Sequence, residues 1–333
     1  MKTGDGEQRQ LFALPPRELR PAEISSEVRA TAAALPAGVR LGTMSWSYPG
    51  WRGLVYAADA PLKALSPLGL TAYARHPLAR AVEIDRTYYD PLPASDLRAY
   101  ADQVPEDFRF VVKAHDACVL ARYPEHARYG MKRGGANDRF LDAAYATDAV
   151  VGPIIEGLGG KLGAVLFQFP PQDVGKGDVF AARLGEFLGR LPKGPTYAVE
   201  LRNADLVVAA YGEALAAAGA VHVHNVWSLM PSLADQARRL PAATRRPLVV
   251  RWLFPRGDSY EEAGARYEPF SRLVDEDVGS RSAVAALVGR ALAHDVPAIV
   301  TVDNKAEGCA PESLARLARA IAARRVASSS PAR

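Results

Sequence analysis

Eight short segments rich in β-branched and aromatic residues recur along the chain, and patterns typical of helices lie between most of them. Alternating strands and helices predict a parallel sheet, and eight such units predict a closed (β/α)8 TIM-like barrel of the α/β class. A doubly wound open sheet is the alternative, but it usually has a glycine-rich phosphate loop after its first strand. Here the first strand continues into SWSYPGW, which lacks that glycine spacing. The predicted strands are 39–43, 81–85, 108–114, 163–169, 196–202, 220–226, 247–253 and 298–304.

The pattern divides the 333 residues into three parts. Residues 1–37 are polar and contain prolines, so we expect a short N-terminal extension with one short helix. Residues 38–325 form the predicted barrel domain, and residues 326–333 are an expected disordered tail.

Composition excludes some classes of protein. Hydrophobic residues make up 49% and charged residues 23%, which is ordinary for a globular protein. The net charge of +4 is too small to indicate a nucleic-acid partner by itself. The N-terminus has no long apolar segment, and no apolar stretch is long enough to span a bilayer. We therefore expect a cytoplasmic protein with no membrane partner, and the oligomeric state stays open.

Charged and polar side chains gather at the carboxyl ends of the predicted strands. Seven of the eight strands end this way, and the carboxyl ends of the strands form the mouth where (β/α)8 enzymes carry their sites. Charged side chains are rarely buried unless they are paired, so the alternative is that these groups only neutralise one another. The candidates at the strand ends are Glu83, Asp85, Lys113, His115, Gln168, Glu200, Arg202, His224, Arg251, Asp303 and Asn304.

The loop after the first strand reads GTMSWSYPGW and contains two of the four tryptophans of the chain. Trp46, Tyr48 and Trp51, with Ser47 between them and Tyr88 after the second strand, could form a platform on which a ring stacks. The alternative is that the tryptophans close the end of the barrel as core residues.

Two carboxylates with different neighbours can share acid and base roles. Glu200 is the best candidate for a base and Glu83 for its partner. Lys113, Arg202 and Arg251 could hold a phosphate or a carboxylate, because arginine binds such groups in a bidentate manner and lysine acts as a point charge. The predicted catalytic residues are therefore Glu200, Glu83 and Lys113.

The same region contains oxygen and nitrogen donors for Mg²⁺, Mn²⁺ or Zn²⁺, namely Glu83, Asp85, Glu200, His224 and Asp303. Neighbouring cations oppose a bound metal, so a divalent metal is not favoured and no metal ligand is assigned. The cofactor, if there is one, is unknown.

Six segments of the chain form a distinctive series, namely GTMSWSYPGWRGLVY, VEIDRTYYDPLP, PEDFRFVVKAH, KLGAVLFQFPP, AVELR and NKAEG. In this order they resemble the YecE-like domain-of-unknown-function proteins, which are TIM-barrel-like. The resemblance covers residues 38–325 and implies the barrel fold and a pocket, but no reaction. The pocket positions it suggests are Trp46, Ser47, Tyr48, Trp51, Glu83, Tyr88, Lys113, Gln168, Pro170, Glu200, Arg202 and Asn304.

Together these patterns favour an enzyme without deciding the question. We expect hydrolysis or isomerisation of an anionic sugar-, phosphate- or nucleotide-like small molecule at the mouth. The alternative is a non-catalytic module that binds nucleic acid or protein, which the six arginines between Arg238 and Arg256 suggest.

Overall fold

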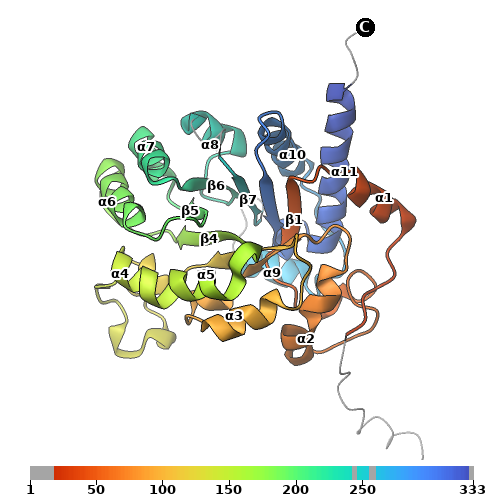
Figure 1. The fold of residues 1–333 in the computed structure, drawn as a ribbon, viewed down its shortest axis with the longest axis horizontal. Coiled ribbons are helices and arrows are strands. Elements are labelled where there is room, and N and C mark those ends of the chain that lie inside the picture. The colour runs from red at the N-terminus through yellow and green to blue at the C-terminus, as the bar shows by residue number, and fades with distance from the viewer. Residues whose placement is uncertain (1–18, 242–245, 255–259, 330–333) are drawn as a thin grey trace, which may run out of the picture.

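Eight parallel strands close into one barrel, in which each strand pairs with the next and β8 pairs with β1 (Figure 1). The computed structural model describes residues 19–241, 246–254 and 260–329. The predicted (β/α)8 barrel is thus confirmed. The strands are β1 (Val39–Thr43), β2 (Ala81–Ile84), β3 (Arg109–Lys113), β4 (Leu162–Phe169), β5 (Tyr197–Leu201), β6 (Val221–Val226), β7 (Leu248–Trp252) and β8 (Ala298–Val302).

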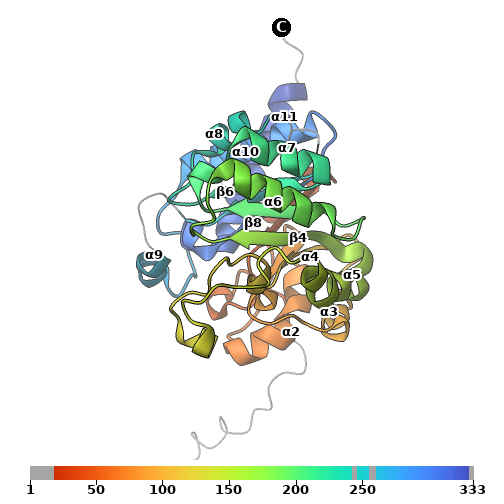
Figure 2. The same cartoon turned by 90° about the vertical axis from the view of Figure 1, so that its left-hand side faces the viewer.

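Helices surround the strands, and the view turned by 90° shows α6 and α7 on one side of β4 with α3 and α5 on the other (Figure 2). A π-helical segment, Ala146–Val151, connects α4 to α5. The helices are α1 (Ser26–Ala34), α2 (Leu62–Ala74), α3 (Ala94–Ala101), α4 (Ala143–Tyr145), α5 (Gly152–Leu158), α6 (Gly177–Gly189), α7 (Ala209–Ala218), α8 (Leu233–Arg239), α9 (Tyr260–Tyr267), α10 (Val278–Leu292) and α11 (Ala310–Ser329).

The strand sequences explain two separate apolar layers. Alternate residues point to opposite faces of a strand, and the outward residues pack against the helices in the main core. A smaller cluster fills the inside of the barrel and includes Val111, Leu166, Val223 and Val249. The interior is therefore packed below the mouth, and space for a ligand is restricted to the end of the barrel.

Gly42 allows the first two strands to approach each other closely. A Cβ atom at this position would lie 1.9 Å from the carbonyl oxygen of Ala81. No other residue fits here without moving the backbone of β2, so the glycine of the GT pair is needed to bring β1 and the loop after it to the mouth.

Polar residues determine where several helices begin. Asp142 accepts hydrogen bonds from the backbone N–H groups of Ala144 and Tyr145, and Asp277 accepts one from Ser280. Gly219 ends α7 in the left-handed conformation with φ of 78°, which glycine adopts at little cost.

A helix lies at or near each end of the described chain. The helix α1 lies within the expected extension 1–37, of which residues 1–18 lie outside the described residues. The helix α11 continues to Ser329, so it enters the range 326–333 that was expected to be a tail, and residues 330–333 are not described. Among the helices of the described ranges, none combines the length and apolar character that crossing a bilayer requires.

Candidate functional site

A buried guanidinium joins opposite sides of the barrel just below the mouth. Arg251 on β7 donates from Nε to Glu83 Oε1 at 2.9 Å and from Nη2 to Glu83 Oε2 at 2.7 Å. Its Nη1 donates to a carboxylate oxygen of Glu200 and to Gln168 Oε1. The Arg251 side chain thereby connects the strands β2, β4, β5 and β7. These strands are far apart in the sequence, so no local sequence pattern predicts the connection.

The Glu200 carboxylate is surrounded by donors. Arg202 donates from Nε to Glu200 Oε1 at 3.1 Å, and Asn225 donates from Nδ2 to the same oxygen at 3.2 Å. Arg202 also donates from Nη2 to Gln168 Oε1 at 3.1 Å. On the opposite side, Thr301 Oγ1 donates to Glu83 Oε1. Six strands thus contribute side chains to one network, and charge-assisted hydrogen bonds of this kind are the strong ones.

The network gives its two carboxyl groups different proton affinities. Burial by itself raises the pKa of Glu200, but Arg251, Arg202 and the hydrogen bonds outweigh it and lower the pKa to about 2. Burial raises the pKa of Glu83, and Arg251 acts against this increase. The pKa of Arg251 is raised well above its ordinary value because, although burial lowers it, Glu200 and Glu83 stabilise the cation.

A second ion pair lies at the rim of the mouth, closer to solvent. Lys113 Nζ, at the end of β3, lies 3.0 Å from Asp85 Oδ1, and the side chains are 12% and 41% exposed. The lysine also lies 5.3 Å from the centre of the Tyr88 ring. These groups adjoin the buried network, because both Asp85 and Lys113 act electrostatically on Glu83. A ligand at the mouth would meet Lys113 and Asp85 before it met Glu83.

Trp227 completes the rim, and sequence analysis missed it. The guanidinium carbon of Arg202 lies 3.7 Å from the centre of a Trp227 ring, a close cation–π contact. The indole Nε1 is buried and has no hydrogen-bond partner among the described residues. The sequence feature that could have identified Trp227 is its position directly after β6, at the carboxyl end of a strand. Asn225, Thr301 and Met44 were missed too, and the Met44 sulfur accepts from Arg251 Nη2 at 3.4 Å.

Two predicted site residues lie away from the mouth, and their placement corrects the prediction. Val223 of β6 packs inside the barrel, so His224 next to it faces outward and borders Leu240 and Arg290. Trp46 is buried outside the barrel, where Nε1 donates to the Ser66 carbonyl of α2 at 3.1 Å. Every residue of β6 is buried, so polarity did not reveal which face points inward.

The remaining residues of the first loop mainly close the barrel. Trp51 is fully buried, and its Nε1 donates to Asn304 Oδ1 at 3.1 Å. Tyr48 packs against Trp51 with ring centres 5.0 Å apart. Ser47 Oγ lies 3.2 Å from Ser45 Oγ, and Asp303 accepts from the backbone N–H of Lys305. The structure therefore favours the interpretation of this loop as a plug over that of a stacking platform.

His115 lies in a cleft beside the mouth rather than in the buried network. Its Nδ1 is 2.6 Å from the Tyr145 hydroxyl, and its Nε2 is 3.4 Å from Asp116 Oδ1. Burial lowers its pKa, and Asp116 acts in the opposite direction. The cleft contains mainly tyrosines and cationic residues.

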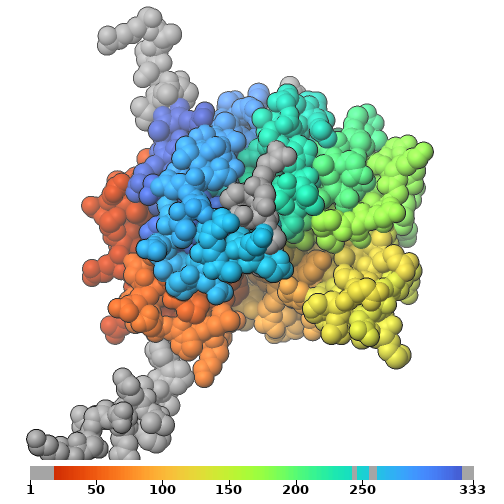
Figure 3. All heavy atoms as spheres, turned by 180° about the vertical axis from the view of Figure 1, so that it is seen from behind, coloured from red at the N-terminus to blue at the C-terminus, as the bar shows by residue number. Residues whose placement is uncertain are grey.

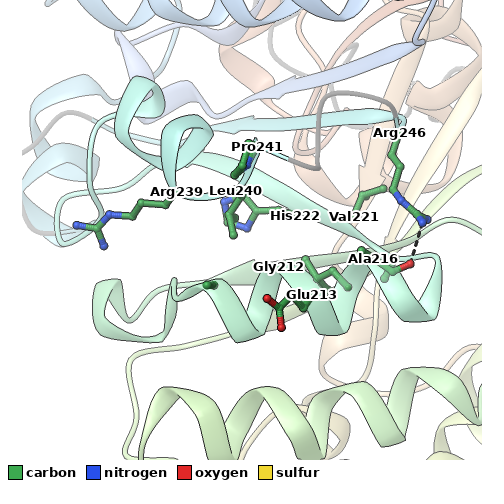
Figure 4. A pocket seen from close by; sticks show the side chains of 12 residues that line it. Gly212, Glu213, Ala216, Val221, His222, Arg239, Leu240, Pro241 and Arg246 are labelled. Atoms are coloured by element: carbon green, nitrogen blue, oxygen red, sulfur yellow. Dashed lines mark hydrogen bonds between the residues drawn. The ribbon is translucent and has the colours of Figure 1, made fainter.

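The arginine-rich stretch does not form one surface in the part of the chain that is described. Arg251 is inside the barrel, Arg246 donates to the Ala216 carbonyl at 2.8 Å, and Arg239 donates to the Ala204 carbonyl at 3.4 Å. Arg245 and Arg256 lie outside the described residues. Figure 4 shows the groove of about 220 Å³ next to Arg246, between α7 and α8, with His222 in its wall. This groove lies outside the barrel and is separate from the mouth.

The donor set at the mouth does not resemble a metal centre. Within the described ranges, no three His, Cys, Asp or Glu side chains are grouped so that they could hold a metal ion. Both Glu83 oxygens accept from Arg251, and both Glu200 oxygens accept from arginine.

The fold and the mouth define a (β/α)8 barrel protein with a charged site at the carboxyl ends of its strands. The sequence profile described as "Protein of unknown function DUF72" matches residues 40–333, and the chain belongs to this family, which includes the YecE-like proteins. No curated protein matches the sequence.

Two solved structures of the family share the fold. A DUF72 protein from Enterococcus faecalis V583 is 18% identical with a TM-score of 0.58, and the match covers 85% of this chain and 95% of that one. A DUF72 protein from Thermotoga maritima MSB8 is 21% identical with a TM-score of 0.56, and the match covers 84% and 97%. At this identity they establish the architecture only.

Proposed function

We propose that the protein is an enzyme that binds an anionic small molecule of the sugar-phosphate or nucleotide type at the mouth and acts by acid–base catalysis. The reaction class is hydrolysis or isomerisation. The observation that supports the proposal is the position of Lys113 and Asp85 at the rim, next to a buried network that includes Arg202 and to which six strands contribute.

The cost of the buried network is the physical argument for a function. Burying an ion pair rarely stabilises a fold more than apolar residues of the same volume would. A chain that keeps Glu83, Arg251 and Glu200 inside its barrel gains fixed charges and oriented donors instead. Preorganised charges of this kind account for much of enzymatic catalysis.

The roles of the residues follow from their exposure and partners. Lys113 and Arg202 bind the negative group of the substrate, and Asp85 transfers the proton because it is the most exposed carboxylate next to Lys113. The sequence favoured Glu200 as the base. Its hydrogen bonds and its pKa of about 2 instead favour a role in which Glu200 holds the Arg202 and Arg251 guanidinium groups in position. Glu83 holds Arg251 from the other side.

The proposal is tested with a panel of sugar phosphates, nucleotides and sugar acids in a thermal-shift assay. Members that bind at the mouth raise the melting temperature of the wild type and of K193A, but not that of K113A. Lys193 is an exposed lysine in the loop before β5, so K193A matches the charge change away from the mouth.

Any binding compound is then assayed for turnover with D85N. We expect at least a 100-fold loss of kcat with little change in affinity, which is the lower range for removing a general acid or base. A panel with no stabilising compound, or equal stabilisation of K113A and wild type by every compound that binds, would refute the assignment of the mouth. If compounds bind at the mouth but the wild type turns none of them over, the protein is a binding module and the proposed enzymatic function is wrong.

A further inference from the structure

The connection from β3 to α4 is unusually long and forms its own cleft. It spans residues 114–142, and its regular structure is limited to short 3-10 turns, among them Asp116–Cys118 and Ala127–Lys132, and one antiparallel bridge between Arg122 and Ala136. This segment forms a lobe at the side of the molecule, in yellow in Figure 3. Connections of this length without regular structure are uncommon in compact domains and are often functional. The cleft that the lobe borders has a volume of about 480 Å³.

Cations and tyrosine rings alternate along the wall of this cleft. The guanidinium carbon of Arg128 lies 4.5 Å from the ring centres of both Tyr89 and Tyr129. Lys132 lies 5.6 Å from the centre of the Tyr123 ring, and Arg139 lies 4.2 Å from that of Tyr145. Such contacts hold cations in place without neutralising them.

Only part of this positive charge is balanced by a carboxylate. Asp116 accepts from Arg128 and, at 2.8 Å, from the Tyr129 hydroxyl. Its side chain is 5% exposed, so it anchors Arg128 more than it faces the cleft. Lys132 and Arg139 line the same cleft and form no ion pair with a carboxylate in the described ranges. Two exposed cations thus remain available to an anion.

Tyr89 supplies an open aromatic surface beside these cations. It is 65% exposed, which is high for a large ring that lines a cleft. Arg128 lies against its ring, and Tyr88 meets it edge to face at 5.5 Å between the ring centres. Aromatic side chains of this kind stack on nucleic-acid bases regardless of base identity.

We infer that this cleft binds a nucleotide unit, whose phosphate is held by Lys132 and Arg139 and whose base stacks on Tyr89. The phosphate ester and the base are common to a free nucleotide and to a single-stranded nucleic acid, and both sources fit the same chemistry. The inference goes beyond the proposed function, since it uses neither Lys113 nor Asp85.

The test measures binding of four probes by calorimetry or fluorescence anisotropy. They are uridine 5′-monophosphate, ribose 5-phosphate, uridine and a fluorescein-labelled octauridylate. We expect the nucleotide and the octamer to bind, and the two fragments that lack a base or a phosphate to bind at least 10-fold more weakly than the nucleotide. If the octamer binds much more tightly than the nucleotide and its affinity falls steeply with salt, the site is assigned to a nucleic-acid chain. Similar affinities for nucleotide and octamer assign it to a free nucleotide.

Variants distinguish binding in the cleft from binding elsewhere on the protein. Y89A weakens binding about 10-fold, the size expected for one stacked base, whereas Y89F keeps it because the ring remains. K132A/R139A weakens binding by a similar factor because the phosphate loses both cations. R190A/K193A removes the same charge at the loop after α6 and keeps the affinity. Unchanged melting temperatures show that the variants are folded.

Three results would overturn the inference. These are no binding of either nucleotide-containing probe at low salt, an equal loss in R190A/K193A, and an unchanged affinity in K132A/R139A and Y89A. The second would indicate bulk charge, and the third would place the ligand outside this cleft.

Discussion

The barrel interior and the cleft beside it both contain charged side chains at the same end of the fold, but the interior charges are buried in ion pairs and the cleft charges lie against aromatic rings. In the interior, Arg251 is fully buried and paired with Glu83 and Glu200. In the cleft, Arg128 and Lys132 lie against tyrosine rings, and Lys132 is exposed. Charges that are buried and mutually paired fix the geometry of the strands, whereas exposed charges on aromatic rings remain accessible to a ligand.

The largest effect should come from breaking the buried network. Replacing Arg251 by methionine leaves buried Glu83 without its guanidinium and Glu200 with Arg202 alone, so R251M should lose about 3–5 kcal/mol of unfolding free energy. Urea denaturation measures this loss. The control R190M changes an exposed arginine directly after α6 and should stay within about 0.5 kcal/mol of wild type. A loss below about 1 kcal/mol in R251M would mean that the network is not a stabilising constraint.

A smaller effect should appear in the pH dependence of stability. The pKa of Glu200 is lowered from 4.5 to about 2, because Arg251 and Arg202 outweigh its burial. Its contribution is therefore complete above about pH 4.5 and is lost as the pH falls toward 2, with a total on the order of 3 kcal/mol. E200Q should remove this part of the acid sensitivity.

The comparison is made on unfolding free energies measured from pH 6 to pH 3. Wild type should lose stability more steeply than E200Q, while E186Q, an exposed change on α6, should follow wild type. Parallel curves for wild type and E200Q would contradict the inferred charge state of Glu200.

The smallest effect on stability should come from the cleft. K132A/R139A removes two exposed cations, so its unfolding free energy should stay within about 0.5 kcal/mol of wild type. Thermal and urea denaturation check this value. A loss comparable to that of R251M would show that the cleft cations are also structural and would remove the contrast between the two regions.

The sequence predicted the strands closely because strand signals are local. Alternating β-branched residues and flanking helices placed all eight strands within two residues of their observed bounds. The alternation also brought Glu83, Glu200 and Arg202 to one end of the barrel, as the structure has them.

Other features depended on information that alternation does not contain. Both faces of β6 are buried, so His224 and Asn225 were equally plausible inward residues, and the structure turns Asn225 inward. The Arg251–Glu83 pair crosses the barrel between β7 and β2, and no local pattern links those strands. The cleft depends on the path of residues 114–142, whose side-chain directions follow from tertiary packing.

A crystal structure of the protein soaked with the sugar phosphate or nucleotide that stabilises wild type but not K113A tests the central claim most directly. We predict that the anionic group lies at the mouth within hydrogen-bond distance of Lys113 Nζ and the Arg202 guanidinium, with Asp85 beside the reacting atoms and Arg251 still paired with Glu83. Ligand density elsewhere on the molecule, with the mouth unoccupied at saturating concentration, would contradict this placement.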